Sequence, residues 1–472
     1  AFVVTAMAND EEMTFEADTR LRERLYQDDF TVLLEIVRPN ADQPFQLGML
    51  PVTEVVRSVA TDKRIHGLVL TGGFQAEAER HSLVDTLAGL KRERKKLPVM
   101  AAVSGTGLSA ENLSELVARL KSAKVSDLLL VSGFAKPSPL KGDFAGHPGA
   151  HLDSTLMLQQ LHVQGLTLAA TVNPFKYNIA DTFLQYYKMA RKIKAGAHFF
   201  VTEAGWDMKK IQELLWYSQQ RNYAIPVIAR LRFVRPQEVV PILDGLCPGQ
   251  VMSREFAAQL QREANVGDQQ AEAAQLRRLA LQATGCRLLG CSGVQIAGIE
   301  DPARLQNLLN EIDTYTQSLT TYKDWLRAWN DYHDRVEMAP YPRHYYAYKN
   351  LLDESLCTYN AQHTLQAHNR LPQATTGDRV RYLIADALSV EKRTGSLGRI
   401  LRKTLCLDAS DQWQLAKTFY VPASQCPKGL EEGPCGGTRP DGTCEIGDRP
   451  CMYHQCLARA RWLRRLDEFE EI

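Results

Sequence analysis

Short apolar runs, rich in valine, isoleucine and leucine, recur through the first two thirds of the chain. Because these runs are continuous rather than alternating, they are typical of parallel strands buried on both faces of a sheet. Eight runs have this character, at residues 32–37, 67–71, 98–104, 127–133, the region of 167–174, 198–203, 225–231 and 294–299. We therefore expect eight buried parallel strands.

Segments with helical spacing of apolar residues lie between these runs. The clearest examples are residues 51–63, 82–96, 111–124, 208–221 and 301–312. Ser109, Asp207 and Asp301 stand just before three of them, where a short polar side chain can accept a hydrogen bond from the first helical turn. Pro302 suits the first helical position, since its missing N–H has no intrahelical partner there.

Eight strands that alternate with helices predict an α/β protein with a (β/α)8 TIM barrel over residues 31–330. An open doubly wound sheet fits less well, because it usually has fewer strands and because no GxGxxG follows the first run. The connection between the seventh and eighth strands, roughly 232–293, is long. We expect it to hold extra helices.

The amino-acid composition changes after the predicted barrel. Residues 331–380 are aromatic and contain prolines, which indicates a connector packed on the barrel. Residues 381–472 predict a small cysteine-rich α+β domain, and residues 1–30 are expected to form an N-terminal extension. A chain of 472 residues has room for one large domain and such smaller units.

Charge and hydropathy narrow the classes of partner. The chain has 56 Lys and Arg against 55 Asp and Glu, and no basic stripe interleaved with aromatics, so we expect no nucleic-acid partner. No apolar stretch approaches the length of a membrane span, so we expect no membrane partner. The N-terminus lacks the basic region of a secretory signal, and a cytoplasmic location is therefore expected.

Six of the ten cysteines lie between residues 406 and 456. Cys426, Cys435, Cys444 and Cys451 stand in loops rich in glycine and proline. Four thiolates are enough for a tetrahedral zinc site or an iron–sulfur cluster. Their spacing is not the CxxC pairing of common zinc ribbons, so four reduced cysteines in a compact module remain the alternative.

Catalytic residues of a TIM barrel lie at the carboxyl ends of its strands. Polar residues at or just beyond the predicted ends are Glu35, Thr71, Ser104, Ser132, Asn173, Glu203, Arg230 and Arg232. Glu35 interrupts an apolar strand, and burial would raise its pKa towards that of a general acid. The alternative is a glutamate paired with a barrel arginine, and the same two interpretations apply to Glu203.

The other strand-end residues also allow two interpretations each. Thr71 begins Thr-Gly-Gly, where glycines would let a flat ligand approach the backbone, although an ordinary turn fits as well. Arg230 and Arg232 are candidates for contacting an anionic substrate tail, or they are solvated arginines.

Several motifs resemble one enzyme family. CPKGLEEGPCGG, at residues 426–437, followed by GTCEIGDRPC, at 442–451, resembles the C-terminal module of some bacterial methylenetetrahydrofolate reductases. KIKAGAHFFVTEAGWD, at 192–207, resembles a barrel segment of the same family, as do TVNPF, at 171–175, and the helix start in LCPGQVMSREFAAQL, at 246–260. The likeness spans most of the chain, and the cysteine block is its most specific part.

The resemblance implies a barrel that interconverts 5,10-methylenetetrahydrofolate and 5-methyltetrahydrofolate with a flavin, FAD, in the reductive or the oxidative, demethylation-linked direction. Glu35 matches the glutamate that protonates the departing folate nitrogen. Thr71 matches a flavin-contacting threonine, Lys192 matches a lysine near the flavin phosphates, and Asn173 falls at the family's fifth-strand end. A tetrahydrofolate derivative is the implied ligand.

The chain departs from the family at several positions. Ser132 and Gly133 stand where the family has a glycine and an aspartate that touch flavin and pterin, and Ala102 replaces a histidine. Glu203 follows Thr202 where the family has glutamine. We hypothesise that Glu203 supplies the missing carboxylate, because a carboxylate accepts the adjacent N–H donors of the pterin edge in bidentate fashion.

Two further functions remain open. The same barrel would suit a folate-binding, methyltransferase-type or carrier subunit, or a non-catalytic partner that binds another protein through its cysteine module. The sequence also leaves open whether the chain forms a homo-oligomer and what its electron donor or acceptor is.

Overall fold

The structure is a computed structural model. It describes residues 20–27, 29–73, 79–133, 151–333, 336–340, 345–348, 351, 356, 371–388, 416–447 and 449–470. Most of the predicted connector and the first part of the predicted extension, like Cys357 and Cys406, lie outside these residues.

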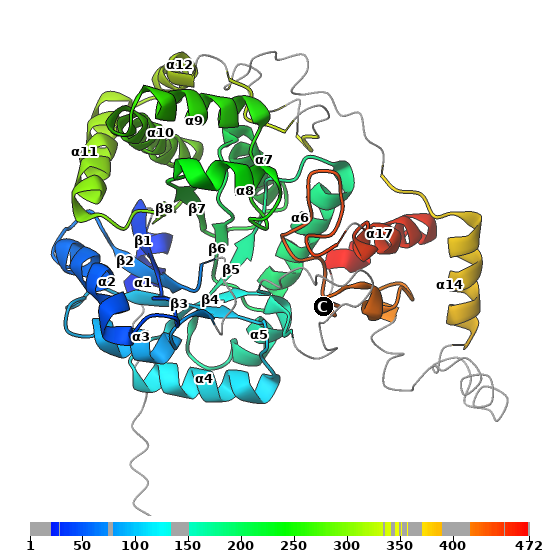
Figure 1. The fold of residues 1–472 in the computed structure, drawn as a ribbon. Coiled ribbons are helices and arrows are strands. Elements are labelled where there is room, and N and C mark those ends of the chain that lie inside the picture. Colours follow the sequence, from blue (N-terminus) through cyan, green and yellow to red (C-terminus); the bar gives the residue numbers. More distant parts are fainter. Residues whose placement is uncertain are drawn as a thin grey trace, which may run out of the picture.

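Eight parallel strands close into a barrel in chain order (Figure 1). The strands are β1 (Thr31–Val37), β2 (Gly67–Thr71), β3 (Val99–Ser104), β4 (Asp127–Val131), β5 (Thr167–Val172), β6 (Phe199–Thr202), β7 (Val227–Arg232) and β8 (Gly293–Ala297). The barrel closes where β1 pairs with β8, with Thr31 opposite Gly293. All eight predicted strands are therefore confirmed, as is the (β/α)8 fold.

Helices that follow the strands form the outer layer (Figure 1). They are α2 (Phe45–Val59), α3 (Leu83–Leu90), α4 (Ala110–Ser122), α5 (Ser154–Leu161), α6 (Ile179–Lys194), α7 (Met208–Gln220) and α11 (Pro302–Ser318), and α12 (Tyr322–His333) follows the barrel. The predicted caps are confirmed, since Ser109, Asp207 and Asp301 each accept a backbone N–H of the helix that follows.

The long connection between β7 and β8 holds extra helices, as expected. These are the short 3-10 helix η2 (Pro236–Glu238), α8 (Val239–Leu243), α9 (Arg254–Val266) and α10 (Asp268–Leu289). α10 packs against α11 and α12, and the indole Nε1 of Trp325 in α12 donates to the carbonyl of Leu281 at 2.8 Å. These contacts fix the outer layer on the β7–β8 side.

Two apolar layers hold the barrel together. The larger one lies between the strands and the outer helices. The smaller one fills the barrel interior with side chains such as Val69 and Phe199, and Leu21 and Leu25 of α1 (Arg20–Tyr26) join it. The predicted N-terminal extension thus includes a helix packed on the barrel core. This filling leaves the opposite, carboxyl-terminal end of the strands as the place for a ligand.

The C-terminal module packs on the outside of the barrel against α6 (Figure 1). Its described elements are α14 (Thr376–Leu388), the 3-10 helices η4 (Ala423–Gln425) and η5 (Asp467–Glu470), and α17 (Met452–Leu463). Ala180 and Leu184 of α6 share a buried apolar cluster with Tyr453 and Leu457 of α17. Barrel and module therefore share a core.

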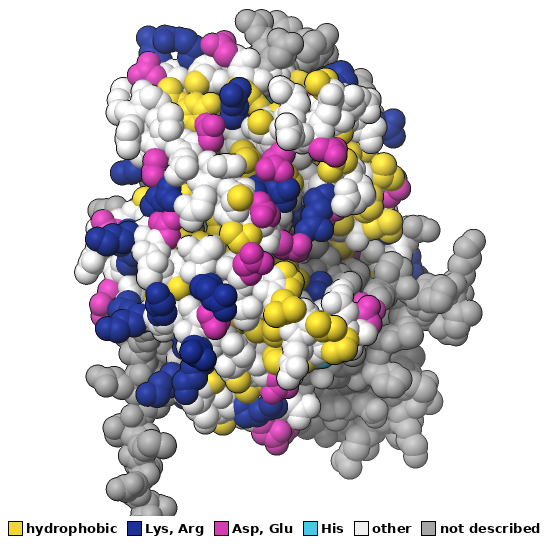
Figure 2. Space-filling view, turned by 60° about the vertical axis from the view of Figure 1, so that its left-hand side comes forward, with side chains coloured by type: hydrophobic (Ala, Val, Ile, Leu, Met, Phe, Trp, Pro, Cys, Tyr) yellow, Lys and Arg dark blue, Asp and Glu magenta, His cyan; other side chains and the backbone are white. Residues whose placement is uncertain are grey.

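Charged side chains of both signs are interspersed over the face shown in Figure 2. This agrees with the near-zero net charge of the chain. Within the described residues, no helix is long and apolar enough to cross a membrane.

Candidate functional site

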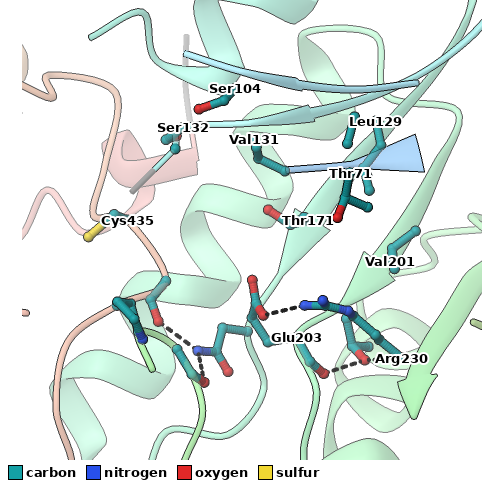
Figure 3. Close-up of a pocket in the computed structure, with 18 of the residues that line it drawn as sticks. Thr71, Ser104, Leu129, Val131, Ser132, Thr171, Val201, Glu203, Arg230 and Cys435 are labelled. Carbon is teal, nitrogen blue, oxygen red and sulfur yellow. Dashed lines mark hydrogen bonds and ion pairs between the residues drawn. The ribbon is translucent and has the colours of Figure 1, made fainter. Parts of the chain in front are cut away.

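A cavity opens at the carboxyl-terminal ends of the strands, where the module meets the barrel (Figure 3). It encloses about 1310 Å³ of empty space, its opening included. Predicted site residues on its wall are Glu35, Thr71, Ser132, Gly133, Asn173, Lys192, Glu203 and Arg230, together with Cys435 of the module. The cavity therefore gathers these residues and Ser104, whereas Arg232 of the predicted strand-end residues does not line it.

Glu35 on β1 and Arg230 on β7 form a bidentate ion pair past β8, the strand that lies between them. Arg230 donates through Nη2 to Oε1 of Glu35 at 2.6 Å and through Nε to Oε2 at 2.7 Å. Gln295 on β8 adds a third hydrogen bond, from Nε2 to Oε2 of Glu35 at 2.6 Å. Three hydrogen bonds thus hold this carboxylate, so the interpretation of Glu35 as a glutamate paired with a barrel arginine is the one observed. Its role as general acid stays a prediction.

Sequence reasoning missed Gln295. It is a polar residue inside the otherwise apolar eighth run, and this is the same signal that identified Glu35. Arg230 lies directly beside Gln295 in the sheet register. Polar residues within the apolar runs of neighbouring strands thus indicate side chains that lie together in the barrel.

Glu203 follows β6 and faces the same arginine. Nη1 of Arg230 donates to Oε2 of Glu203 at 3.3 Å, a longer contact than the pair with Glu35. Burial raises the pKa of Glu203 above its usual range, the charge of Arg230 opposes this shift, and Glu35 adds to it. Figure 3 shows Glu203 and Arg230 on one side of the cavity and Cys435 on the other. Glu203 is thus the less tightly held of the two carboxylates.

Arg232, the second predicted anion contact, is held away from the cavity. Nη1 donates to Oε1 of Gln250 at 2.6 Å, and Nη2 pairs with Oε1 of Glu238 at 2.5 Å. Both partners belong to the β7–β8 connection, so Arg232 ties this connection to the barrel.

Lys192 reaches the cavity from the last turn of α6. Its Nζ donates to the carbonyl oxygen of Thr171 on β5 at 2.7 Å. Burial, and next the positive charge of Lys188, lower the pKa of Lys192 to about 7. A lysine with this pKa can release or take up a proton at neutral pH.

The predicted ligand contacts after β2 and β4 are engaged in local structure. Oγ1 of Thr71 accepts the backbone N–H of Gly73 at 2.9 Å, which makes the ordinary turn. Ser132 shares a hydrogen bond of 3.0 Å with the hydroxyl of Ser154. Gly133 has φ +85°, and a Cβ there would lie 2.1 Å from Oγ1 of Thr106, so only glycine fits.

Asn173 at the end of β5 joins three parts of the chain. Its Nδ2 donates to the carbonyls of Gly249 at 2.9 Å and Gly436 at 2.6 Å, and its Oδ1 accepts from the backbone N–H of Phe175. Lys176 donates to the same Gly436 carbonyl at 2.8 Å. The fifth-strand end therefore anchors the module.

Buried ion pairs attach the module to the cavity wall. Lys428 donates to the carbonyl of Gly133 at 2.6 Å and pairs with Glu445, and the thiol of Cys435 lies 3.6 Å from Oε1 of Glu445. The partners raise the pKa of Lys428 above its usual range although burial opposes this. Sequence reasoning missed this cluster, because Gly133 and Lys428 are 295 positions apart.

Two more buried pairs bridge α6 and its surroundings. Lys188 pairs with Asp153 at 2.7 Å, and Arg191 pairs with Glu432 of the module at 2.5 Å. A charge removed from water is stabilised only by such a close partner. The pair of Arg191 with Glu432 therefore helps to fix the position of the module on α6.

The four cysteines predicted to bind metal line one small cavity inside the module. However, among the described residues, which include all four, no group of three or more His, Cys, Asp or Glu side chains is arranged to hold a metal ion. Burial raises the pKa of Cys435 to about 12 and that of Cys426 above its usual range in the metal-free chain. The arrangement as it stands does not fit zinc, and we derive no step through a metal.

The residues predicted to bind FAD use most of their hydrogen-bonding groups within the chain. Thr71, Ser132 and Asn173 have their polar atoms bonded within the chain, and the carbonyl of Gly133 already accepts from Lys428. Lys192 donates one hydrogen bond, to the carbonyl of Thr171, and its ammonium group has further N–H donors. This set does not form a flavin cradle, so no chemical step is derived through flavin.

Comparison with known families confirms the resemblance for the C-terminal segment. Residues 399–472 match the model of the family described as methylene-tetrahydrofolate reductase C terminal. This segment contains Lys428, Cys435 and Glu445, which line the cavity. No curated protein sequence matches the chain.

Solved structures similar to the chain include three proteins with low sequence identity. A protein from Clostridium thermocellum, described as binding two copies of 5-methyl-5,6,7,8-tetrahydrofolic acid, is 14% identical with a TM-score of 0.47 and covers 63% of this chain and 99% of that chain. An oxaloacetate acetylhydrolase is 9% identical, with a TM-score of 0.37 and coverages of 65% and 89%. A 2,3-dimethylmalate lyase is 12% identical, with a TM-score of 0.34 and coverages of 64% and 86%. At these scores the similarity carries no argument about function.

Proposed function

We propose that the chain binds a reduced folate at the mouth of the barrel and interconverts 5,10-methylenetetrahydrofolate and 5-methyltetrahydrofolate, together with a separate electron donor or acceptor that supplies or takes up the two electrons of this step. One observation carries this proposal: the segment that matches the reductase C-terminal family supplies Lys428, Cys435 and Glu445 to the wall of the cavity. The matched segment and the strand ends that carry Glu35 and Arg230 thus line the same cavity, where a TIM barrel is expected to bind its ligand.

Glu203 is our candidate for holding the pterin. The aminopyrimidine edge of a pterin presents two adjacent N–H donors, which match the two oxygens of a carboxylate. Arg230 already orients Glu203 through Oε2. Burial without a full set of partners raises the pKa of Glu203, and two donors from the ligand would stabilise its charged form.

Glu35 acts, in this proposal, through Arg230 as a positioning residue. Its carboxylate holds the guanidinium with two hydrogen bonds, and Gln295 holds the carboxylate in turn. The acid role implied by the family resemblance requires Glu35 to take up a proton, which would weaken this pair. Lys192, with a pKa of about 7, is the cavity residue better suited to exchange a proton with the folate at neutral pH.

A second candidate function is a folate-binding, methyltransferase-type or carrier barrel that works without flavin. The hydrogen bonds that engage Thr71, Ser132 and Asn173 within the chain favour this alternative. Both candidate functions place the pterin on Glu203, so a measurement of folate binding tests the site that they share. The flavin content of the protein distinguishes the two functions.

The test is a calorimetric titration of the intact purified protein with 5-methyltetrahydrofolate, accompanied by a visible absorbance spectrum. Glu203→Gln should bind about tenfold more weakly, since one charge-assisted contact is lost. Glu93→Gln, which removes a carboxylate paired with Arg57 on the outer surface, is the matched control and should bind like the wild type.

Bound flavin together with folate binding supports the reductase, and folate binding by a colourless protein supports the second candidate. Equal affinity of Glu203→Gln and the wild type would contradict the role of Glu203. Absence of folate binding by the wild type would contradict both functions and leave a non-catalytic partner.

A further inference from the structure

Lys192 lies on the wall of the cavity, at a place where a neutral group orients its amine. The residue is 6% exposed, and its Nζ donates to the carbonyl oxygen of Thr171 at 2.7 Å. Glu203 acts on Lys192 through its charge, but the ion pair of this carboxylate is with Arg230. A carbonyl oxygen therefore fixes the direction of the amine without forming an ion pair with it.

A second lysine lies beside the first. Lys188 and Lys192 are four positions apart on α6, so their side chains lie on the same face of the helix, and both line the cavity. Lys188 is fixed by an ion pair with Asp153 at 2.7 Å and by a hydrogen bond to the carbonyl of Gly433 at 3.0 Å. Burial, and next the cation of Lys188, lower the pKa of Lys192 to about 7. Burial next to another cation is the arrangement that makes a lysine nucleophilic at neutral pH.

A carboxyl group that can carry protons lies at the same cavity. Thr171 on β5 pairs with Val201 on β6, and Glu203 follows Val201 by two positions, so its side chain points to the same face of the sheet. Figure 3 shows Thr171, Val201 and Glu203 around the cavity. Burial raises the pKa of Glu203 above its usual range, which suits a group that gives and takes a proton.

An amine and a carboxyl group in one cavity suit the addition of an amine to a carbonyl compound, followed by loss of water. We propose that Lys192 is a nucleophile that forms an iminium ion with formaldehyde and passes this one-carbon unit to N5 of a reduced folate. The inference rests on the proposed function for the position of the folate. It adds a second reaction at this site, the condensation of formaldehyde with tetrahydrofolate.

The iminium ion forms before the folate binds, while Glu203 is available for proton transfer. The neutral amine of Lys192 forms a C–N bond to the carbon of formaldehyde, and the carbonyl oxygen takes up the proton that the nitrogen loses. Protonated Glu203 then gives its proton to the hydroxyl group, the C–O bond breaks, water leaves, and the lone pair of the nitrogen forms the C=N bond. No electrons pass to or from another molecule.

The transfer to tetrahydrofolate is also balanced. N5 forms a bond to the iminium carbon and gives its proton to the nitrogen of Lys192. The bond between this nitrogen and the carbon then breaks, so that Lys192 leaves as the neutral amine. N10 closes the ring of 5,10-methylenetetrahydrofolate and releases one proton to water. Glu203, now charged, accepts the N–H donors of the pterin, as in the proposed function.

The first test traps the iminium ion in the intact wild-type protein with deuterated formaldehyde and sodium cyanoborohydride, which reduces it to an N-methyl group. At about pH 6.5, about a quarter of Lys192 is unprotonated, against about one in ten thousand of ordinary lysines. Peptide mass spectrometry should therefore show methylation of Lys192 at least about tenfold faster than that of Lys323, an exposed lysine on α12. Equal rates at the two lysines would overturn the inference.

The second test measures the formation of 5,10-methylenetetrahydrofolate from tetrahydrofolate and dilute formaldehyde, above the spontaneous rate. The wild type should accelerate the reaction, and Lys192→Arg and Lys192→Met should each lower this acceleration at least about tenfold while folate affinity in calorimetry stays the same. Lys323→Met is the matched control and should behave like the wild type. The same acceleration in the wild type and in both Lys192 variants would overturn the transfer step.

The outcomes separate this inference from the proposed function. Folate binding without preferred methylation of Lys192 leaves the proposed function in place and overturns the nucleophile. Preferred methylation in a protein that binds no folate contradicts the proposed function, supports the nucleophile and overturns the transfer. The trapping experiment uses no substitution, so a folding defect cannot affect it, and melting curves check the two variants.

Discussion

Glu35 on the first strand of the barrel and Arg230 on the seventh share two hydrogen bonds of 2.6 and 2.7 Å in the wall of the cavity. The side chain of Glu35 is 3% exposed, and Glu203 approaches the same guanidinium. One arginine therefore pairs with a buried carboxylate, Glu35, and a part-buried one, Glu203.

Removal of this arginine should destabilise the fold strongly. Arg230→Met leaves Glu35 and Glu203 in the interior without their cation, and breaking a buried pair from one side costs about 3 kcal/mol or more. Urea unfolding at neutral pH should show this loss in the free energy of unfolding. Glu35→Gln combined with Arg230→Met should recover part of it, because one uncompensated charge is then gone. A loss below about 1 kcal/mol for Arg230→Met would show that water already screens the pair.

The attachment of the module should depend on Lys428. Lys428→Met leaves Glu445 buried without a cation and removes the hydrogen bond to Gly133, so we expect a loss of about 3 kcal/mol and faster proteolysis within residues 416–470. Lys417→Met is the control, because Lys417 is 44% exposed and its pair with Glu432 should contribute less than about 1 kcal/mol. Equal effects of the two substitutions would mean that Lys428 does not hold the module.

Two histidines should make the barrel sensitive to acid. Nδ1 of His66 accepts the backbone N–H of Val32 and Nδ1 of His198 accepts that of Leu168, which requires both rings to be neutral at this nitrogen. Burial lowers the pKa of each ring from 6.5 to about 4. The unfolded chain then binds more protons than the folded one, so this stability is present above pH 6.5 and is lost as the pH falls towards 4.

His66→Asn and His198→Asn offer an oxygen in place of Nδ1 and do not titrate. Each should flatten the fall of the unfolding free energy across that interval, measured by urea unfolding at a series of pH values. The same slope in the double variant as in the wild type would rule out these rings as the source of acid sensitivity.

Lys192 should make stability rise with pH in the same direction as the two histidines, but over a higher pH interval. Its pKa is about 7 in the folded chain and 10.5 without its surroundings, so the folded state binds fewer protons between these values and stability rises with pH there. Lys192→Met removes this penalty, and the variant should gain on the wild type at pH 6 and lose that advantage as the pH approaches 10.5. A constant difference between the two proteins at every pH would indicate that Lys192 titrates normally.

The sequence predicts the barrel well because each strand carries its own signal. Each of the eight runs is buried on both faces, and caps such as Ser109 and Asp301 act within one helical turn. The sequence also predicts three residues of the cavity wall, Glu35, Glu203 and Arg230, because the carboxyl-terminal ends of all strands lie at the same end of a barrel.

The contacts that complete the site could not be predicted in the same way. Lys428 meets Gly133, and Arg191 meets Glu432, only after the module has packed on α6. Arg232 carries the same local signal as Arg230, yet Gln250 and Glu238 of the long connection bind it. Which partner each of these side chains binds depends on tertiary contacts, and such contacts produce no periodic pattern in the sequence.

Hydrogen–deuterium exchange of the intact protein with and without 5-methyltetrahydrofolate tests most directly the claim that the barrel mouth beneath the module is a folate site. The account predicts slower exchange, on adding the folate, in peptides that contain Glu203, Arg230 and Gly436, with no change in the exposed outer helix α4. Folate binding that leaves these three peptides unchanged and slows exchange elsewhere would contradict it.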